Sequence, residues 1–231
     1  MITNILRGEF ELIPFLLRIP IVLIALSVHE CAHGYAAYKM GDPTAKAFGR
    51  LTLNPIKHLD LFGTISMLLF GFGWAKPVPV NARRFDNPKK GMAMTALAGP
   101  LSNVLLSIIG AILFLSTEAL LQKFPHLMGQ SEFSFNLWYL LLLFFLMFHI
   151  MNLSLAIFNL LPIPPLDGSR LAFVFLPDRL YFDFMKYEQI IQAILMVALF
   201  TGLLDTPLSY AINSLSSGIM SAISFLLGLI I

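Results

Sequence analysis

Residues 21–38 read IVLIALSVHECAHGYAAY, an apolar stretch with two histidines and a glutamate in its second half. Positions i and i+4 share one face of an α-helix, so His29 and His33 can meet at one point while Glu30 lies one step round. Two imidazoles at this spacing bind zinc, and a carboxylate beside them can act as a general base. The alternative is a polar network between membrane helices. Cys31 faces away from the histidines and is predicted to be a small buried residue.

The composition predicts a membrane protein. Of the 231 residues, 58% are hydrophobic and only 12% are charged, and the mean hydropathy is +0.81. So few charges cannot cover the surface of a soluble domain of this size, and the lipid bilayer is the expected solvent. A net charge of +2 gives no reason to expect nucleic acid as a partner.

Long stretches without charged residues locate the spans. A spanning helix needs roughly 20 residues, and three uncharged stretches exceed that length: Gly91–Thr117, Phe133–Leu166 and Thr206–Ile231. The metal helix, about Phe10–Tyr38, and a shorter run, Gln189–Leu204, bring the expected number to five. We therefore predict an all-α polytopic membrane protein with a single domain over residues 1–231, a catalytic core of about 20–175 and a C-terminal helical hairpin at 189–231.

Residues 61–81 do not fit a simple span. Leu61–Ala75 is uncharged but broken by glycines, and it has basic loops on both sides, so a crossing would violate the positive-inside rule. A re-entrant segment fits better, although a span remains the alternative. The alternating prolines that follow favour an extended edge at Val78, Pro79, Val80 and Asn81, which we predict as a small re-entrant β element. The basic loops place the active-site mouth on the cytoplasmic side of a multi-pass cell-membrane protein.

A third metal ligand is needed, and Asp167 is the first acidic residue after the uncharged stretch that ends at Leu166. Its carboxylate could complete a site of two histidines and one carboxylate with an open position. It could equally be the N-cap of a short helix that begins near Ser169. The residues alone leave the two possibilities open.

The motifs together resemble the site-2 protease family of intramembrane zinc metalloproteases, in a compact form without a PDZ or nucleotide-sensing domain. The resemblance rests on His29–His33, Gly99-Pro100-Leu101-Ser102-Asn103, Asn159 and Leu166-Asp167-Gly168, with Gly41-Asp42-Pro43-Thr44 and Gly49–Pro55 after the metal helix. It implies that Asp167 is the third zinc ligand, that Asn103 helps to stabilise the oxyanion and that Asn159 lies beside the substrate. It also implies that the re-entrant region 61–81, with the edge at Val78–Asn81, binds the substrate, and pairing of that edge with an unwound strand would resemble strand addition. On sequence alone, Asn103 would more often hold helices together.

We therefore predict a zinc-dependent endopeptidase that hydrolyses peptide bonds in or near transmembrane segments of substrate proteins. A membrane metal transporter and a proteolytically inactive membrane scaffold are the alternatives. A transporter has no need for Glu30 beside the ligands, and an inactive scaffold has no need for the complete set of catalytic residues.

Overall fold

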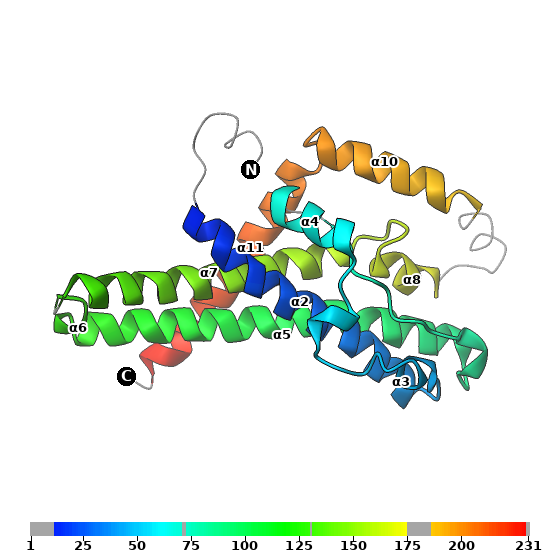
Figure 1. The fold of residues 1–231 in the computed structure, drawn as a ribbon, viewed down its shortest axis with the longest axis horizontal. Helices are drawn as coiled ribbons and strands as arrows, with labels where there is room; N and C mark the ends of the chain where they lie inside the picture. Colours follow the sequence, from blue (N-terminus) through cyan, green and yellow to red (C-terminus); the bar gives the residue numbers. More distant parts are fainter. Residues whose placement is uncertain (1–11, 71–72, 130, 175–185, 230–231) are drawn as a thin grey trace.

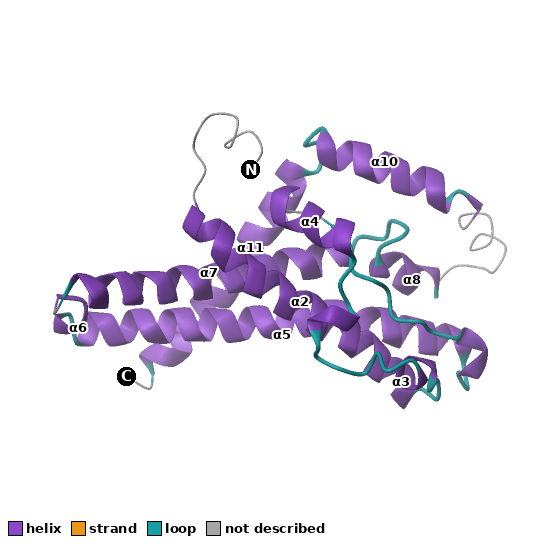
Figure 2. Cartoon of the chain, in the orientation of Figure 1, coloured by secondary structure: helices purple, strands orange, loops and turns teal. Residues whose placement is uncertain are grey.

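The computed structural model describes residues 12–70, 73–129, 131–174 and 186–229. Every regular element in these ranges is helical, which confirms the all-α prediction (Figure 2). The elements are α2 (Leu12–Lys39), α3 (Thr44–Ala47), η1 (Pro55–Lys57), α4 (Leu61–Phe70), η2 (Ala82–Arg84), α5 (Pro88–Lys123), α6 (His126–Gly129), α7 (Glu132–Asn159), α8 (Asp167–Phe173), α10 (Glu188–Phe200) and α11 (Asp205–Gly228).

Four of the described helices, α2, α5, α7 and α11, are long and apolar enough to cross a membrane. The fifth expected span, Gln189–Leu204, forms α10, which has 13 residues. A helix of that length is about 20 Å long, shorter than the hydrocarbon core of a bilayer. The described residues therefore contain four candidate spans and one shorter apolar helix.

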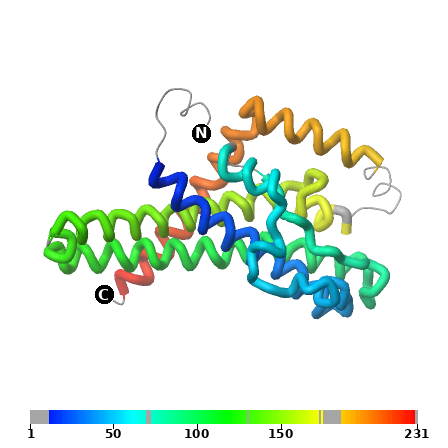
Figure 3. Tube along the Cα trace, in the orientation of Figure 1, coloured from blue at the N-terminus to red at the C-terminus, as the bar shows by residue number. Residues whose placement is uncertain are grey.

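The helices α5 and α7 run side by side in opposite directions, and α2 crosses them (Figures 1 and 3). Small residues line the places where the helices meet, including Ala25, Ala96, Ala111 and Ala156, all nearly or fully buried. Many large apolar side chains face outward instead, such as Leu105 and Ile109. Lipid supplies little hydrophobic drive between helices, so close backbone approach through small residues is the expected packing.

The segment after η1 turns back on itself. Its helix α4 has ten residues and is therefore only about 15 Å long. A β-carbon on Gly63 would overlap the carbonyl oxygen of Trp74, and one on Gly73 would overlap the carbonyl oxygen of Gly63. The two ends of the segment are therefore in contact, a close approach that only glycine permits.

Residues 74–81 follow as a loop without strand assignment. The chain there makes one backbone bond to another segment, from the Lys76 N–H to the His58 carbonyl, among the backbone bonds of the described residues. A strand needs a partner along a ladder, and this segment has none, so the β part of the predicted re-entrant element is not confirmed.

Candidate metal centre

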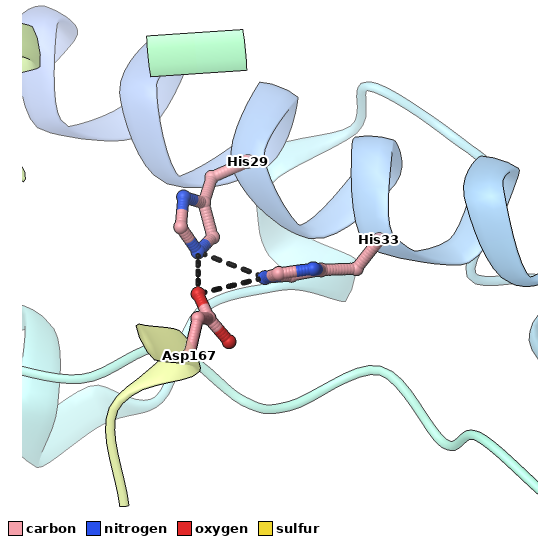
Figure 4. Close-up of side chains that lie close together, drawn as sticks. All are labelled: His29, His33 and Asp167. Carbon is pink, nitrogen blue, oxygen red and sulfur yellow. Dashed lines mark hydrogen bonds and ion pairs between the residues drawn. The ribbon is translucent and has the colours of Figure 1, made fainter. Parts of the chain in front are cut away.

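Three side chains converge at one point between α2 and α8 (Figure 4). The Nε2 atoms of His29 and His33 are 3.0 Å apart, and each is 3.2 Å from Oδ2 of Asp167. Both histidines are buried, and the aspartate is partly buried. The structure thus brings together the three residues that the sequence singled out as ligands.

Asp167 reaches this point because the chain after α7 folds tightly. A β-carbon on Gly168 would overlap the carbonyl oxygen of Leu160, so glycine allows the loop to close. The N-cap residue of α8 is Leu166, which makes no side-chain capping bond, and the carboxylate of Asp167 turns to the histidines. The alternative in which Asp167 caps a helix beginning near Ser169 is not supported.

The tautomer of His33 follows from its partner on α5. Its Nδ1 lies 2.6 Å from the backbone carbonyl oxygen of Thr95. A carbonyl oxygen only accepts, so Nδ1 carries the proton and Nε2 of the neutral ring carries a lone pair. That lone pair points to the convergence point.

The same argument holds for His29. Its Nδ1 lies 2.6 Å from Oδ1 of Asn103, whose Nδ2 donates to the Ala25 carbonyl and to Oδ1 of Asn152. Because the Ala25 carbonyl can only accept, the amide of Asn103 is fixed with its oxygen towards His29. Its N–H groups are thus engaged away from the convergence point, and its oxygen accepts a hydrogen bond from Nδ1 of His29.

The chemistry of this donor set fits a divalent metal ion. Two Nε2 lone pairs and one carboxylate oxygen face one another, and the imidazoles have no proton there to share. Such an arrangement is stabilised by a cation, and zinc takes nitrogen and oxygen ligands of this kind. Three protein ligands leave a fourth position open for water or substrate. Cys31 is half-buried and does not join the cluster.

Glu30 stands beside the cluster and outside it. Its side chain is buried, and its Oε2 accepts a hydrogen bond of 3.0 Å from the backbone N–H of Val78. The bond fixes one carboxylate oxygen and connects the metal helix to the loop that the sequence predicted as substrate-binding. Glu30 is therefore held beside the cluster by this hydrogen bond and is not one of the three converging side chains.

A cavity of about 790 Å³ contains the cluster. Its wall includes both histidines, Glu30 and Asp167, and the predicted substrate residues Val78, Val80 and Asn159. Of the other residues predicted to bind substrate, Pro79 and Asn81 are not on this wall. Asn159 also donates through Nδ2 to the Leu155 carbonyl.

Sequence reasoning missed the role of one face of α5. Residues Thr95, Gly99, Asn103 and Ser107 are spaced by four, and all are buried. Thr95 and Asn103 bind the two histidines, and a β-carbon on Gly99 would overlap both rings. A run of small or polar residues at four-residue spacing was the signal that could have identified this face. At its far end, Ser107 bonds to His149, which also meets Ser216 of α11.

Residues 18–202 match the model of the family described as Peptidase family M50. A protein of Bacillus subtilis (strain 168) named "Putative zinc metalloprotease YwhC" is 46% identical over 165 residues, which cover 70% of this chain and 68% of that protein. The protein named "Putative zinc metalloprotease Rip2" from Mycolicibacterium smegmatis is 28% identical over 159 residues, or 67% of this chain and 55% of that protein. The protein of the same name from Mycobacterium tuberculosis (strain ATCC 25618 / H37Rv) is 30% identical over 150 residues, which cover 63% of this chain and 52% of that protein. The chain thus spans about half the length of these mycobacterial relatives. No solved structure matches it.

Proposed function

Because this chain belongs to peptidase family M50 and is a zinc-dependent intramembrane peptidase, we propose that His29, His33 and Asp167 hold its zinc ion and that Glu30 is its general base. The observation that carries this assignment is the convergence of three ligand atoms within 3.2 Å of one another, with the carboxylate of Glu30 outside the set. The family match does not favour the transporter or the inactive scaffold.

Zinc, when bound, supplies a Lewis acid that lowers the pKa of water and polarises the peptide carbonyl. Glu30 accepts a proton from the attacking water and delivers it to the leaving amine. The Val78 N–H holds Oε2, so that Oε1 remains for this transfer.

Thr95 and Asn103 keep the two imidazoles in the tautomer that presents Nε2, through the bonds that they accept from Nδ1. An oxyanion role for Asn103 would require its N–H to leave the Ala25 carbonyl or the Asn152 side chain. We therefore assign Asn103 to orienting His29 first, and to the oxyanion only if that network opens during the reaction.

The substrate is a transmembrane segment that unwinds before cleavage. A helix hides its carbonyls in internal hydrogen bonds, and breaking these in a membrane leaves unsatisfied backbone groups. Pairing with the edge at Val78–Asn81 would satisfy them, in the manner of strand addition. The places of Val78, Val80 and Asn159 on the wall of the metal cavity support this role.

Residues 61–81 form a re-entrant segment that opens to the cytoplasm, and the β pairing forms when substrate binds. The shortness of α4 and the contact of Gly63 with Trp74 support a return to the same side. Nine of the 15 Lys and Arg residues lie between residues 39 and 90, on both flanks of this segment. The positive-inside rule then favours the cytoplasm for both flanks. The membrane-embedded unit is one domain, with α2 to α8 as its catalytic core.

The test is the zinc content of the purified protein together with cleavage of a transmembrane peptide in detergent or vesicles. We expect about one zinc per chain and cleavage that a chelator abolishes. A His29→Ala variant that kept full zinc would contradict the assigned ligand set.

A further inference from the structure

Two buried charged residues lie outside the metal centre and have no part in its chemistry. Asp42 is fully buried and Arg50 is 7% exposed, and they flank α3 in the segment after the metal helix. Charged side chains are almost never buried to this extent unless they are paired. Glycines with positive φ, Gly41 and Gly49, form the turns that precede them.

Both residues bind the backbone of the loop that carries Val78. The Oδ2 of Asp42 accepts a hydrogen bond of 2.6 Å from the Asn81 N–H. Its Oδ1 accepts from the backbone and hydroxyl of Thr44. The guanidinium of Arg50 donates from Nη2 to the carbonyl of Lys76 and, over 3.3 Å, to that of Pro77. Arg50 thus holds the beginning of residues 76–81, and Asp42 holds the end.

The bonds to the Pro77 carbonyl and from the Asn81 N–H fall on the same edge of the segment. In extended backbone, successive residues direct their N–H and C=O groups to opposite edges. Pro77 and Asn81 are four positions apart in the sequence and therefore share one edge, which Arg50 and Asp42 hold. Pro79 lies between them on the same edge and has no N–H to satisfy. Val78, on the opposite edge, directs its N–H to Glu30.

Val80 shares the edge of Val78. Within the part of the chain that the structure describes, no hydrogen bond is made by its N–H or by the carbonyls of Val78 and Val80. This edge lies beside Glu30, and both valines line the metal cavity. A free donor and free acceptors on an extended edge are what an unwound peptide can pair with.

We propose that Asp42 and Arg50 are substrate-positioning residues, which hold residues 76–81 from behind so that the edge of Val78 and Val80 meets the substrate backbone beside Glu30. This inference rests on the proposed function, in which that edge binds substrate. Burial raises the pKa of Asp42, but bonds from the Asn81 N–H and from Thr44 outweigh it and hold that pKa below its usual value. The carboxylate is therefore charged at neutral pH and a strong acceptor.

The experiment measures binding and turnover separately. The variants are Asp42→Ala and Arg50→Gln, the conservative Asp42→Asn and Arg50→Lys, and Lys46→Gln as a matched control that removes an exposed charge from the same segment. Each is made in the full chain, and its zinc content and thermal unfolding are recorded. Affinity for a labelled transmembrane peptide is measured in the Glu30→Gln background, where cleavage does not interfere, and KM and kcat in the active background.

We expect a weaker peptide affinity and a higher KM, each by about tenfold or more, as for the loss of a hydrogen bond to a charged group. Zinc content should stay unchanged, the conservative variants should recover part of the affinity, and Lys46→Gln should match the parent. Unchanged affinity, or a loss of zinc and folding in step with the loss of affinity in the conservative variants, would overturn the proposal. Failure of the proposed function is seen separately, as absence of peptide cleavage by the unmodified chain.

Discussion

Gly99 lies so close to His33 that a β-carbon at this position would overlap Nε2 of the imidazole. The same β-carbon would lie 2.7 Å from Cε1 of His29. The glycine therefore lets α5 approach the metal helix at the level of the ligands, and Thr95 and Asn103 reach the two Nδ1 atoms from either side of it. Gly99 contributes no side chain to the proposed metal site, yet the positions of both imidazoles depend on its lack of a β-carbon.

The change Gly99→Ala should lower both zinc affinity and cleavage by at least tenfold, because the methyl group must displace one or both imidazoles. Metal affinity measured by competition with a chelator checks this. The matched control is Gly218→Ala, in α11, where a β-carbon meets nothing within 4 Å. That control should be neutral or slightly stabilising, since alanine is the better helix former by about 1 kcal/mol. Equal zinc affinity in the two variants would contradict the close approach.

Glu30→Gln should keep about one zinc per chain while cleavage falls by about 10²–10⁴-fold, the usual contribution of a general base. The amide can still accept the Val78 N–H, so the loop should stay in place. Metal analysis and a peptide cleavage assay on the same preparation decide the matter. Loss of zinc from this variant would make Glu30 a ligand and the assigned roles wrong.

Asp167→Ala should weaken zinc binding as well as cleavage, because two imidazoles alone make a poor zinc site. The matched control is Asp205→Ala, which should keep its zinc. Asp205 has a carboxylate on the wall of the same cavity but lies outside the ligand cluster. Cys31→Ser should likewise keep its zinc, since Cys31 does not join the cluster. Full zinc retention by Asp167→Ala would leave Asp167 without a role in the metal site.

The proximity of the two histidines could be predicted from the sequence because the information for it is local. The spacing of His29 and His33 on a helix follows from helical geometry alone. Asp167 could be placed only as a carboxylate at the end of a span, and its approach to the histidines depends on a tight turn at Gly168. A ligand brought in by a distant loop cannot be derived from spacing.

The contacts of α5 and the extent of α10 could not be predicted in the same way. Thr95 binds His33 through its backbone carbonyl, which every residue possesses, so no side chain marks it. The expected span at Gln189–Leu204 was inferred from absence of charge, whereas the helix ends at Phe200 and is followed by a turn with Gly202 at positive φ. Lack of charge shows that a segment tolerates lipid and does not fix how far its helix extends.

Cysteines placed at Lys57 and Arg84 should both be labelled from the cytoplasmic side alone, because the segment between them returns to the side it left. The measurement uses a membrane-impermeant thiol reagent on sealed vesicles of either orientation, in a Cys31→Ser background that lacks the chain's one native cysteine. Lys123→Cys, at the C-terminal end of α5, serves as the control and should be labelled from the opposite side. Labelling of the first two positions from opposite sides would mean that residues 61–75 cross the membrane.

Replacing Val78–Asn81 by a Gly-Ser run of equal length should slow cleavage at low substrate concentration by tenfold or more while zinc content stays the same. The metal ligands lie on other elements, so the site should still bind zinc. The new segment keeps the backbone N–H groups at positions 78, 80 and 81. It loses the valine side chains on the cavity wall and the proline that restricts the backbone, so ordering it against a substrate costs more entropy. Zinc content, KM and kcat measured together separate this effect from damage to the metal centre. The control is the same replacement at His126–Gly129, in the connection between α5 and α7, which should change none of the three. An unchanged KM in the Val78–Asn81 variant would mean that the substrate strand docks elsewhere on the cavity wall.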